Sequence, residues 1–209
     1  MFPDIARDDI FRLETARLWL RWPRASDAAA VHRYGSKWEV AQFTARIPHP
    51  YPQGSAERFI FAAREGNSSG RDLTLMLTPI KGKRDPIGAV SLELRGKDRL
   101  TLGYALAPQA WGKGYATEAV EAMVEAAFSL TPAVEINASV RVENPASRRV
   151  LEKVGFQFLA TGPQGAPARG GLVNCDLLQI TRAAWAARRA LTHALPASAA
   201  ATEIHHEIP

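Results

Sequence analysis

The chain has little cysteine: Cys175 is the single one among 209 residues. One cysteine excludes an internal disulfide and a metal site built from several cysteines. The chain also lacks an apolar run near the roughly 18 residues that a membrane-spanning helix needs. Its first ten residues carry four charges and no apolar stretch, which argues against a secretory signal peptide. These absences predict a cytoplasmic protein that does not associate with a membrane.

The chain also lacks a long run of like charge. It has 26 Lys and Arg against 21 Asp and Glu, a net charge of +5, and a basic surface can attract nucleic acid or a polyanionic cofactor. The closest basic groupings, residues 81–84 and Arg148-Arg149, are too short for a nucleic-acid stripe. We therefore expect an ordinary solvated surface and no specific nucleic-acid partner.

Hydrophobic periodicity predicts an α/β domain of alternating strands and helices. Period-two alternation predicts strands over 15–22, 72–78, 87–94, 99–107, 134–142, 156–160 and 172–181. Helical spacing and capping residues predict helices over 27–34, 55–65, 115–130, 145–154 and 183–194. The three closely spaced strands between 72 and 107 suggest an antiparallel meander, and residues 162–171 are expected to form a Gly/Pro-rich loop. We expect an N-terminal extension over 1–13, one domain over 14–194 and a disordered tail over 195–209.

The segment Gln109 to Ala116 joins a predicted strand to the clearest predicted helix. Its two glycines, Gly112 and Gly114, allow the backbone to approach a bulky diphosphate and turn N–H groups toward it. The helix start adds unpaired N–H groups and the positive end of its dipole. The loop lacks the Lys-Ser or Lys-Thr of a Walker loop and the third glycine of a dinucleotide fingerprint. It therefore predicts a different kind of anion-binding loop.

The pattern Gln109-x-x-Gly112-x-Gly114-Tyr115-Ala116 resembles the acetyl-CoA signature of the GNAT N-acetyltransferases. The segment from Asn144 to Phe156 resembles the second half of their site. The opening Glu14 to Arg21 resembles the first strand of the ribosomal-protein N-acetyltransferase-like branch. The resemblance extends from about Glu14 to Arg189 and is specific for the superfamily, although not for a substrate.

The resemblance implies a mixed, mostly antiparallel sheet flanked by helices, with a V-shaped splay between the parallel strands 99–107 and 134–142. In the family, the opened backbone binds the pantetheine arm of acetyl-CoA as a missing strand would. It implies no metal and the following acetyl-CoA-binding residues: Leu106, Ala107, Gln109, Gly112, Lys113, Gly114, Tyr115, Ala116, Asn144, Ser147 and Lys153. Arg148 and Arg149 are alternatives to Lys153 for the adenosine phosphate.

Acetyl transfer to an amine sets further requirements, because the amine must lose a proton before it attacks. Glu93 and Asp176 are candidate bases that the sequence does not separate, with Glu93 as the working choice, and a water chain is the alternative. Ser147 is the candidate donor to the departing thiolate, although it and Asn144 could instead serve only to cap their helix. Tyr104 is interpreted as a sheet residue rather than an acid.

The aromatic residues Trp38, Phe43 and Tyr51 fall in an irregular stretch and are candidates to line the acceptor pocket. The sequence therefore predicts an enzyme that transfers the acetyl group of acetyl-CoA to a primary amine by direct attack. The acceptor is a protein N-terminus or a small-molecule amine. The alternative is a regulatory module that binds CoA without catalysis. The oligomeric state stays open, with a homodimer as one option.

Overall fold

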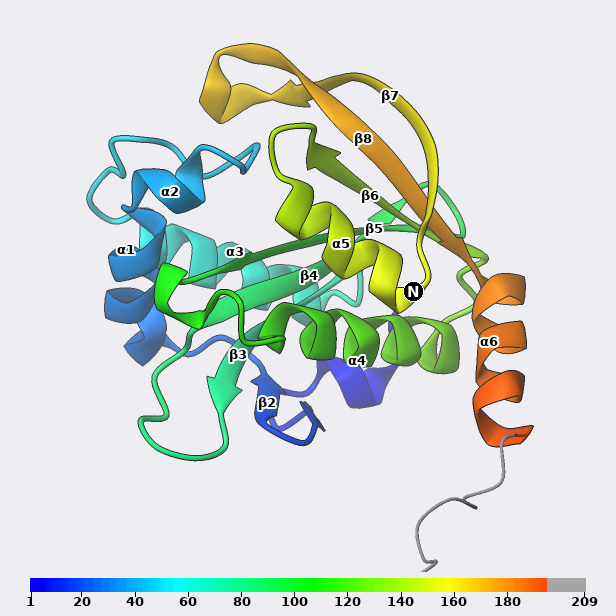
Figure 1. Ribbon diagram of the computed structural model, residues 1–209. Helices are drawn as coiled ribbons and strands as arrows, with labels where there is room; N and C mark the ends of the chain where they lie inside the picture. Colours follow the sequence, from blue (N-terminus) through cyan, green and yellow to red (C-terminus); the bar gives the residue numbers. More distant parts are fainter. Residues whose placement is uncertain (195–209) are drawn as a thin grey trace, which may run out of the picture.

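The computed structural model describes residues 1–194, and these residues form one eight-stranded sheet with helices on both faces (Figure 1). The strand order is β1-β2-β3-β4-β5-β6-β8-β7. The strands are β1 (Arg12–Glu14), β2 (Leu18–Arg21), β3 (Asp72–Pro79), β4 (Gly88–Arg95), β5 (Arg99–Leu106), β6 (Glu135–Arg141), β7 (Gln157–Ala166) and β8 (Gly171–Thr181). Neighbouring strands are antiparallel except for β5 and β6, which are parallel. The predicted α/β fold with a mixed, mostly antiparallel sheet is therefore confirmed.

The helices are α1 (Ala28–Gly35), α2 (Trp38–Ala41), α3 (Ser55–Ser68), α4 (Tyr115–Leu130), α5 (Pro145–Val154) and α6 (Arg182–Ala194). Alternation along β3 assigns them to two faces. Leu73, Leu75 and Leu77 belong to the large core under α4 and α5, whereas Met76 belongs to a second core with α1 and α3. No helix within residues 1–194 is long and apolar enough to cross a membrane.

The V-shaped splay lies between β5 and β6. Their parallel pairing covers Arg99 to Thr101 against Glu135 to Asn137. β5 remains paired with β4 up to Leu106, and β6 remains paired with β8 up to Arg141. The two strands therefore diverge after Thr101 and Asn137, which leaves facing backbone edges without ladder partners in the second half of each strand.

The helices α4 and α5 have the bounds that the sequence predicts, because their signals are local. Gly114 precedes α4 in the left-handed conformation, and Thr131 and Pro132 follow its last residue. Asn144 caps α5, Pro145 occupies its first position and Gly155 ends it at a φ of 109°.

The prediction of a loop over 162–171 is wrong. β7 continues to Ala166 and pairs with β8 through Pro163 and Gly165, so that only the short η4 helix (Pro167–Arg169) forms the tip. β7 is the edge strand of the sheet, and an edge position tolerates a proline that cannot donate to the ladder. The hairpin curves past the end of the sheet and brings its tip to the region that follows α2 (Figure 1).

Residues 1–13, predicted as an extension, pack on the sheet. Phe2 and Ala6 are buried in the large core. The N–H groups of Met1 and Phe2 both donate to the Gly70 carbonyl at 2.9 Å. The first residues therefore contact the domain that is predicted to begin at Glu14, and the boundary itself stays a prediction. The predicted tail over 195–209 lies outside the described residues.

Candidate active site

The loop between β5 and α4, here called the cradle, has the backbone geometry that the predicted anion-binding site requires. Gly112 and Gly114 adopt φ values of 71° and 79°, a left-handed backbone that favours glycine. Gly114 is the N-cap of α4, and no side chain caps the helix there. The first N–H groups of this 16-residue helix therefore lack intrahelical partners and carry the positive end of its dipole. A Cβ built on Gly112 meets nothing within 4 Å, so the loop is open at this position.

The end of β5 is attached to this cradle. Leu106 and Ala107 are buried, and the indole N–H of Trp111 donates to the Leu106 carbonyl at 2.8 Å. This bond folds the loop back over the end of the strand. Gln109 and Lys113 are exposed on the outside of the loop, and Tyr115 and Ala116 begin α4 half-buried.

Sequence reasoning missed the brace behind the cradle. The Arg17 Nε donates to Glu118 on α4 at 2.7 Å, and its Nη1 donates to the Lys113 carbonyl at 2.9 Å. Its guanidinium also lies 4.7 Å from the centre of the Tyr115 ring. Thr15 donates to the same carboxylate at 2.5 Å. Burial raises the pKa of Glu118, but hydrogen bonds from Thr15 and Arg17 outweigh it and hold the pKa below its ordinary value.

Replacing Glu118 with glutamine is expected to loosen this brace. The lost charge-assisted bonds should reduce the free energy of unfolding by roughly 1–3 kcal/mol at pH 7. A carboxyl with a depressed folded pKa stabilises above its unfolded pKa and loses that effect as the pH falls through the folded value. The stability gap between parent and variant, measured by urea unfolding, should therefore close below the ordinary pKa of 4.5. Glu121→Gln, on the exposed side of α4, is the control. A gap that does not narrow at all as the pH falls below 4.5 would show that the brace acts through packing instead.

The start of α5 faces the open part of β5. Asn144 Oδ1 accepts the Ser147 N–H at 3.1 Å, so Asn144 caps the helix. The Ser147 Oγ lies 2.7 Å from the Tyr104 hydroxyl, which also donates to the Ser147 carbonyl at 3.2 Å. Burial raises the pKa of Tyr104 to about 12, against a smaller lowering by its bond to Ser147. The structure thus brings Asn144, Ser147 and Tyr104 together at the splay.

The two candidate bases are engaged by other side chains. The Glu93 carboxylate binds Arg46 through Oε1 and Arg95 through Oε2, the latter at 2.7 Å. Asp176 accepts from Thr161 and from Arg148, both at 2.7 Å. The hydrogen bond from Thr161, and then the one from Arg148, hold the pKa of Asp176 below its ordinary value despite some burial. In this arrangement, neither carboxylate has an oxygen free of such a contact.

Residues 42–47, here called the strap, connect α2 to the C-terminal half of the sheet. The Gln42 carbonyl accepts from Arg141 of β6 at 3.0 Å. The Ala45 carbonyl accepts from the Ala168 N–H at the hairpin tip at 3.0 Å, and the Ile47 carbonyl accepts from Arg169. The strap thereby bridges the two sides of the splay on the face opposite α5.

The predicted acceptor-pocket aromatics lie at and beside this strap. Phe43 belongs to it and is half-buried. Trp38 begins α2 with 49% of its surface exposed, and the Arg169 guanidinium lies 5.4 Å from its ring centre. Tyr51 instead packs on α1, with its ring 5.5 Å from His32. Their role in binding an acceptor stays a prediction.

The sequence profile of the Acetyltransferase (GNAT) domain matches residues 17–157, which is more than half of the chain. The chain belongs to the GNAT acetyltransferase family. It is an acetyl-CoA-dependent acetyltransferase, as the cradle and the splay predict. The matched region includes Arg17 and Glu118 of the brace, the cradle, the splay and the start of α5.

Similar proteins support the GNAT assignment. The chain is 31% identical over 146 residues to the uncharacterized N-acetyltransferase YoaA of Bacillus subtilis, which covers 69% of this chain and 82% of YoaA. Its fold is similar to that of a ribosomal-protein-S5-alanine acetyltransferase from Vibrio fischeri, with a TM-score of 0.71 and 21% identity over 84% of this chain and 98% of the other. A spermidine N-acetyltransferase from Vibrio cholerae in complex with CoA and spermine gives a TM-score of 0.68 and 18% identity over 82% and 99%.

The basic residues of α5 have different surroundings in this acetyltransferase. Arg148 pairs with Glu152 and Asp176 and lies 4.7 Å from the Phe158 ring centre. Arg149 is exposed, and so is Lys153 in the last turn of the helix. With Arg148 held by two carboxylates, Arg149 and Lys153 are the α5 candidates for the adenosine phosphate. That role stays a prediction.

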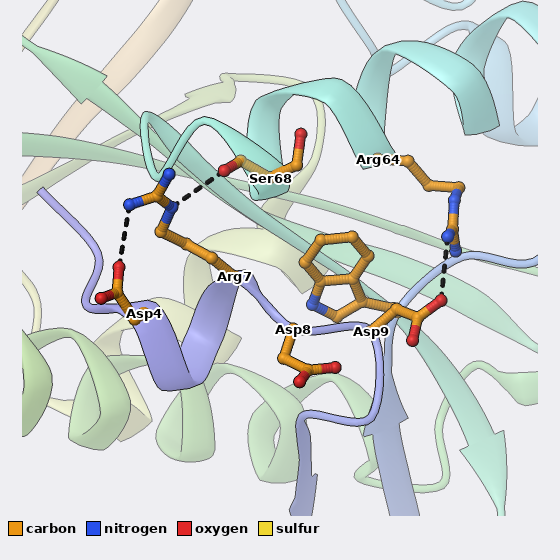
Figure 2. A pocket seen from close by; sticks show the side chains of 7 residues that line it. Asp4, Arg7, Asp8, Asp9, Arg64 and Ser68 are labelled. Carbon is orange, nitrogen blue, oxygen red and sulfur yellow. Dashed lines mark hydrogen bonds and ion pairs between the residues drawn. The ribbon is translucent and has the colours of Figure 1, made fainter.

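The acetyltransferase also has a hollow of about 460 Å³. Figure 2 shows the side chains that line it. Its lining comes from the N-terminal segment, Trp22 just after β2 and the C-terminal half of α3, and includes no residue of β5, β6, α4 or α5. Arg7 binds Asp4 and the Ser68 carbonyl, and Arg64 binds Asp9. The Arg7–Ser68 hydrogen bond and the Arg64–Asp9 ion pair attach the first residues of the chain to α3, so we interpret the hollow as structural. Within residues 1–194, no group of three His, Cys, Asp or Glu side chains is placed to hold a metal ion.

Proposed function

We propose that the enzyme transfers acetyl from acetyl-CoA to a primary amine by direct attack, and that its preferred acceptor is an α-amine. The α-amine belongs either to a protein N-terminus or to a small molecule. The observation that carries the proposal is the open splay between the cradle and Ser147. The unpaired backbone edges suit the pantetheine arm of acetyl-CoA, and the N–H groups at the start of α4 suit its diphosphate. The Ser147 hydroxyl suits its sulfur.

In the proposed reaction, one N–C bond forms and one C–S bond breaks. The neutral amine nitrogen attacks the acetyl carbon, the C–S bond breaks, and the electron pair goes to sulfur. A backbone N–H on the unpaired edge of β5 can donate to the acetyl oxygen as negative charge develops. Ser147 can donate to the thiolate, and the α5 helix start favours negative charge beside it. The nitrogen gives its proton to water.

The preference for an α-amine follows from the engaged carboxylates. Glu93 and Asp176 are both held by guanidinium groups, so the acceptor has to arrive largely deprotonated by solvent. At pH 7, roughly a tenth of an α-amine with a pKa near 8 is neutral, against less than a thousandth of an alkyl amine near 10.4. This difference of more than about 100-fold favours α-amines.

A panel of amines tests the acceptor. Peptides with free N-termini, free amino acids and spermidine are compared with acetyl-CoA as donor, because solved relatives include acetyltransferases of a ribosomal protein and of spermidine. We expect the highest kcat/KM with α-amines, and a rate that rises about tenfold per pH unit up to the amine pKa. A higher kcat/KM for spermidine at pH 7 contradicts the α-amine preference. It leaves acetyl transfer itself in place.

Replacing Gly114 with aspartate is expected to abolish stabilisation by acetyl-CoA. At 100 times its dissociation constant, the ligand should add about 2.7 kcal/mol to the stability of the parent. A side chain at a φ of 79° and a negative charge at the cradle oppose both the loop conformation and the diphosphate. The readout is the thermal midpoint with and without acetyl-CoA. Gly96→Asp matches the backbone strain, at a φ of 75° in the β4–β5 turn, and should keep the full ligand effect. Equal ligand effects in the two variants would contradict the placement of the cradle.

A regulatory module that binds CoA without catalysis is the alternative function. It shares the cradle and therefore predicts the same stabilisation by acetyl-CoA. Turnover of acetyl-CoA with any amine of the panel excludes it.

A further inference from the structure

We propose that Tyr104 is a positioning residue that directs the Ser147 hydroxyl toward the sulfur of coenzyme A, so that the two hydroxyls form one donor chain. This inference rests on the proposed role of Ser147. It concerns a residue whose sequence context predicts a place in the sheet rather than a role as an acid.

The geometry joins the two sides of the splay. Tyr104 stands on β5 beyond Thr101, where the strand has left β6, and its side chain packs on the α4 and α5 face. From there its hydroxyl reaches both the Oγ of Ser147, at 2.7 Å, and the Ser147 carbonyl, at 3.2 Å. One phenol therefore contacts the strand-facing side of the α5 start at two atoms.

Each hydroxyl has one proton, which allows two arrangements. In the first, Tyr104 donates to the Ser147 carbonyl and Ser147 donates to the phenol oxygen. In the second, Tyr104 donates to the Ser147 Oγ, and the serine proton points away from the tyrosine. The Ser147 carbonyl loses little in the second arrangement, because as the first turn of a helix it also accepts from the residue four positions later.

The second arrangement is the one that serves the departing thiolate. As the C–S bond breaks and the electron pair goes to sulfur, the serine proton turns to the sulfur and Tyr104 donates to the Oγ. The Ser147 hydroxyl accepts a hydrogen bond from Tyr104 and is polarised by it. Its own hydrogen bond to the sulfur is therefore strengthened. Both hydroxyls keep their protons, and no net proton moves.

Two physical features keep Tyr104 suited to this task. Burial raises its pKa to about 12, so it remains a protonated donor throughout the neutral range. Its hydroxyl also gives the Ser147 Oγ a hydrogen-bond partner from outside the helix. A first-turn serine without such a partner can bond back to a carbonyl three or four residues earlier and turn away from the sulfur.

The test titrates the thiol of bound CoA by the ultraviolet absorbance of its thiolate, with CoA-free protein as the blank for Cys175. We expect the thiol pKa to rise by about one unit in Ser147→Ala and by about half a unit in Tyr104→Phe. In the double variant the rise should equal that of Ser147→Ala alone, because Tyr104 acts through Ser147. The kcat of Tyr104→Phe should fall roughly three- to tenfold, with a KM for acetyl-CoA within about twofold of the parent.

Tyr34→Phe is the control, since it removes the hydroxyl of a tyrosine that is buried in the core under α1 and α3, away from α5. It should leave the CoA titration unchanged. A Tyr104→Phe titration equal to the parent overturns the inference, as does an equal shift by Tyr104→Phe in the parent and in the Ser147→Ala background. If Ser147→Ala is itself silent in titration and kcat, the proposed role of Ser147 fails and the inference falls with it. If the Tyr104 hydrogen bond has only a structural role, Tyr104→Phe would lower the thermal midpoint and leave the pKa of the CoA thiol unchanged, which also contradicts the inference.

Discussion

Replacing Ser147 with alanine is expected to lower kcat by roughly 10- to 1000-fold, the range of a lost transition-state donor or proton-transfer group. The hydroxyl lies in the first turn of α5, whose start favours negative charge. Its bond to sulfur grows as charge develops on the thiolate, so it stabilises the transition state more than bound acetyl-CoA. The dissociation constant of acetyl-CoA should therefore stay within about twofold of the parent.

Asn144→Ala is expected to weaken CoA binding more than it lowers kcat, the opposite of Ser147→Ala. It removes the acceptor of the Ser147 N–H, which costs about 1 kcal/mol of helix capping. It also removes an amide that can bond the pantetheine, so CoA binding should weaken more than kcat. Steady-state kcat and calorimetric binding of CoA, measured for both variants, separate the two roles. If the Ser147→Ala enzyme keeps the parent's kcat, Ser147 has only a structural role in the first turn of α5. Water would then solvate the thiolate.

Replacing Asp27 with asparagine is expected to reduce the free energy of unfolding by roughly 3–5 kcal/mol. Asp27 accepts two bonds from the Arg21 guanidinium, at 2.8 and 2.9 Å, and one from the Arg24 N–H at 2.8 Å. The side chains of Asp27 and Arg21 are 4% and 12% exposed. Removing one charge leaves the other buried without its partner, which is the costly case for a buried ion pair.

The exposed pair Arg33–Asp85 is the control for this change. Its side chains are 61% and 62% exposed, so Asp85→Asn should alter stability by less than about 1 kcal/mol. Urea unfolding of both variants at pH 7 measures the difference. If Asp27→Asn also stays below 1 kcal/mol, solvent reaches the pair and the burial argument is wrong.

The parts of the fold that the sequence predicts are those with local signals. The bounds of α4 and α5 follow from Gly114, Asn144 and Gly155, which act within one turn of each helix. The loop prediction for the hairpin is wrong because its pairing depends on β8, while Pro163 and the neighbouring glycines locally indicate a loop. A local pattern does not reveal that a strand will lie at the edge of a sheet.

The candidate site divides in the same way. The cradle is a contiguous motif and could be found from the sequence. The brace joins Arg17 to Glu118 across 101 residues, and the Tyr104–Ser147 contact spans 43. The engagement of Glu93 by Arg46 spans 47 residues. Such contacts are set by how strands and helices pack, so no spacing rule within one element reveals them.

The strap has a consequence for how this enzyme can change over evolutionary time. Its three ties to the C-terminal half all end on its own main-chain carbonyls, those of Gln42, Ala45 and Ile47. A carbonyl is present whatever the side chain, so substitutions along residues 42–47 leave the acceptor groups of these ties in place. The donors Arg141 and Arg169, by contrast, act through their guanidinium groups, so substitution of either arginine removes its hydrogen bond to the strap. Mutations can therefore accumulate in the segment beside the proposed acceptor pocket while the segment stays anchored, which is the condition under which acceptor preference diverges among descendants of one scaffold.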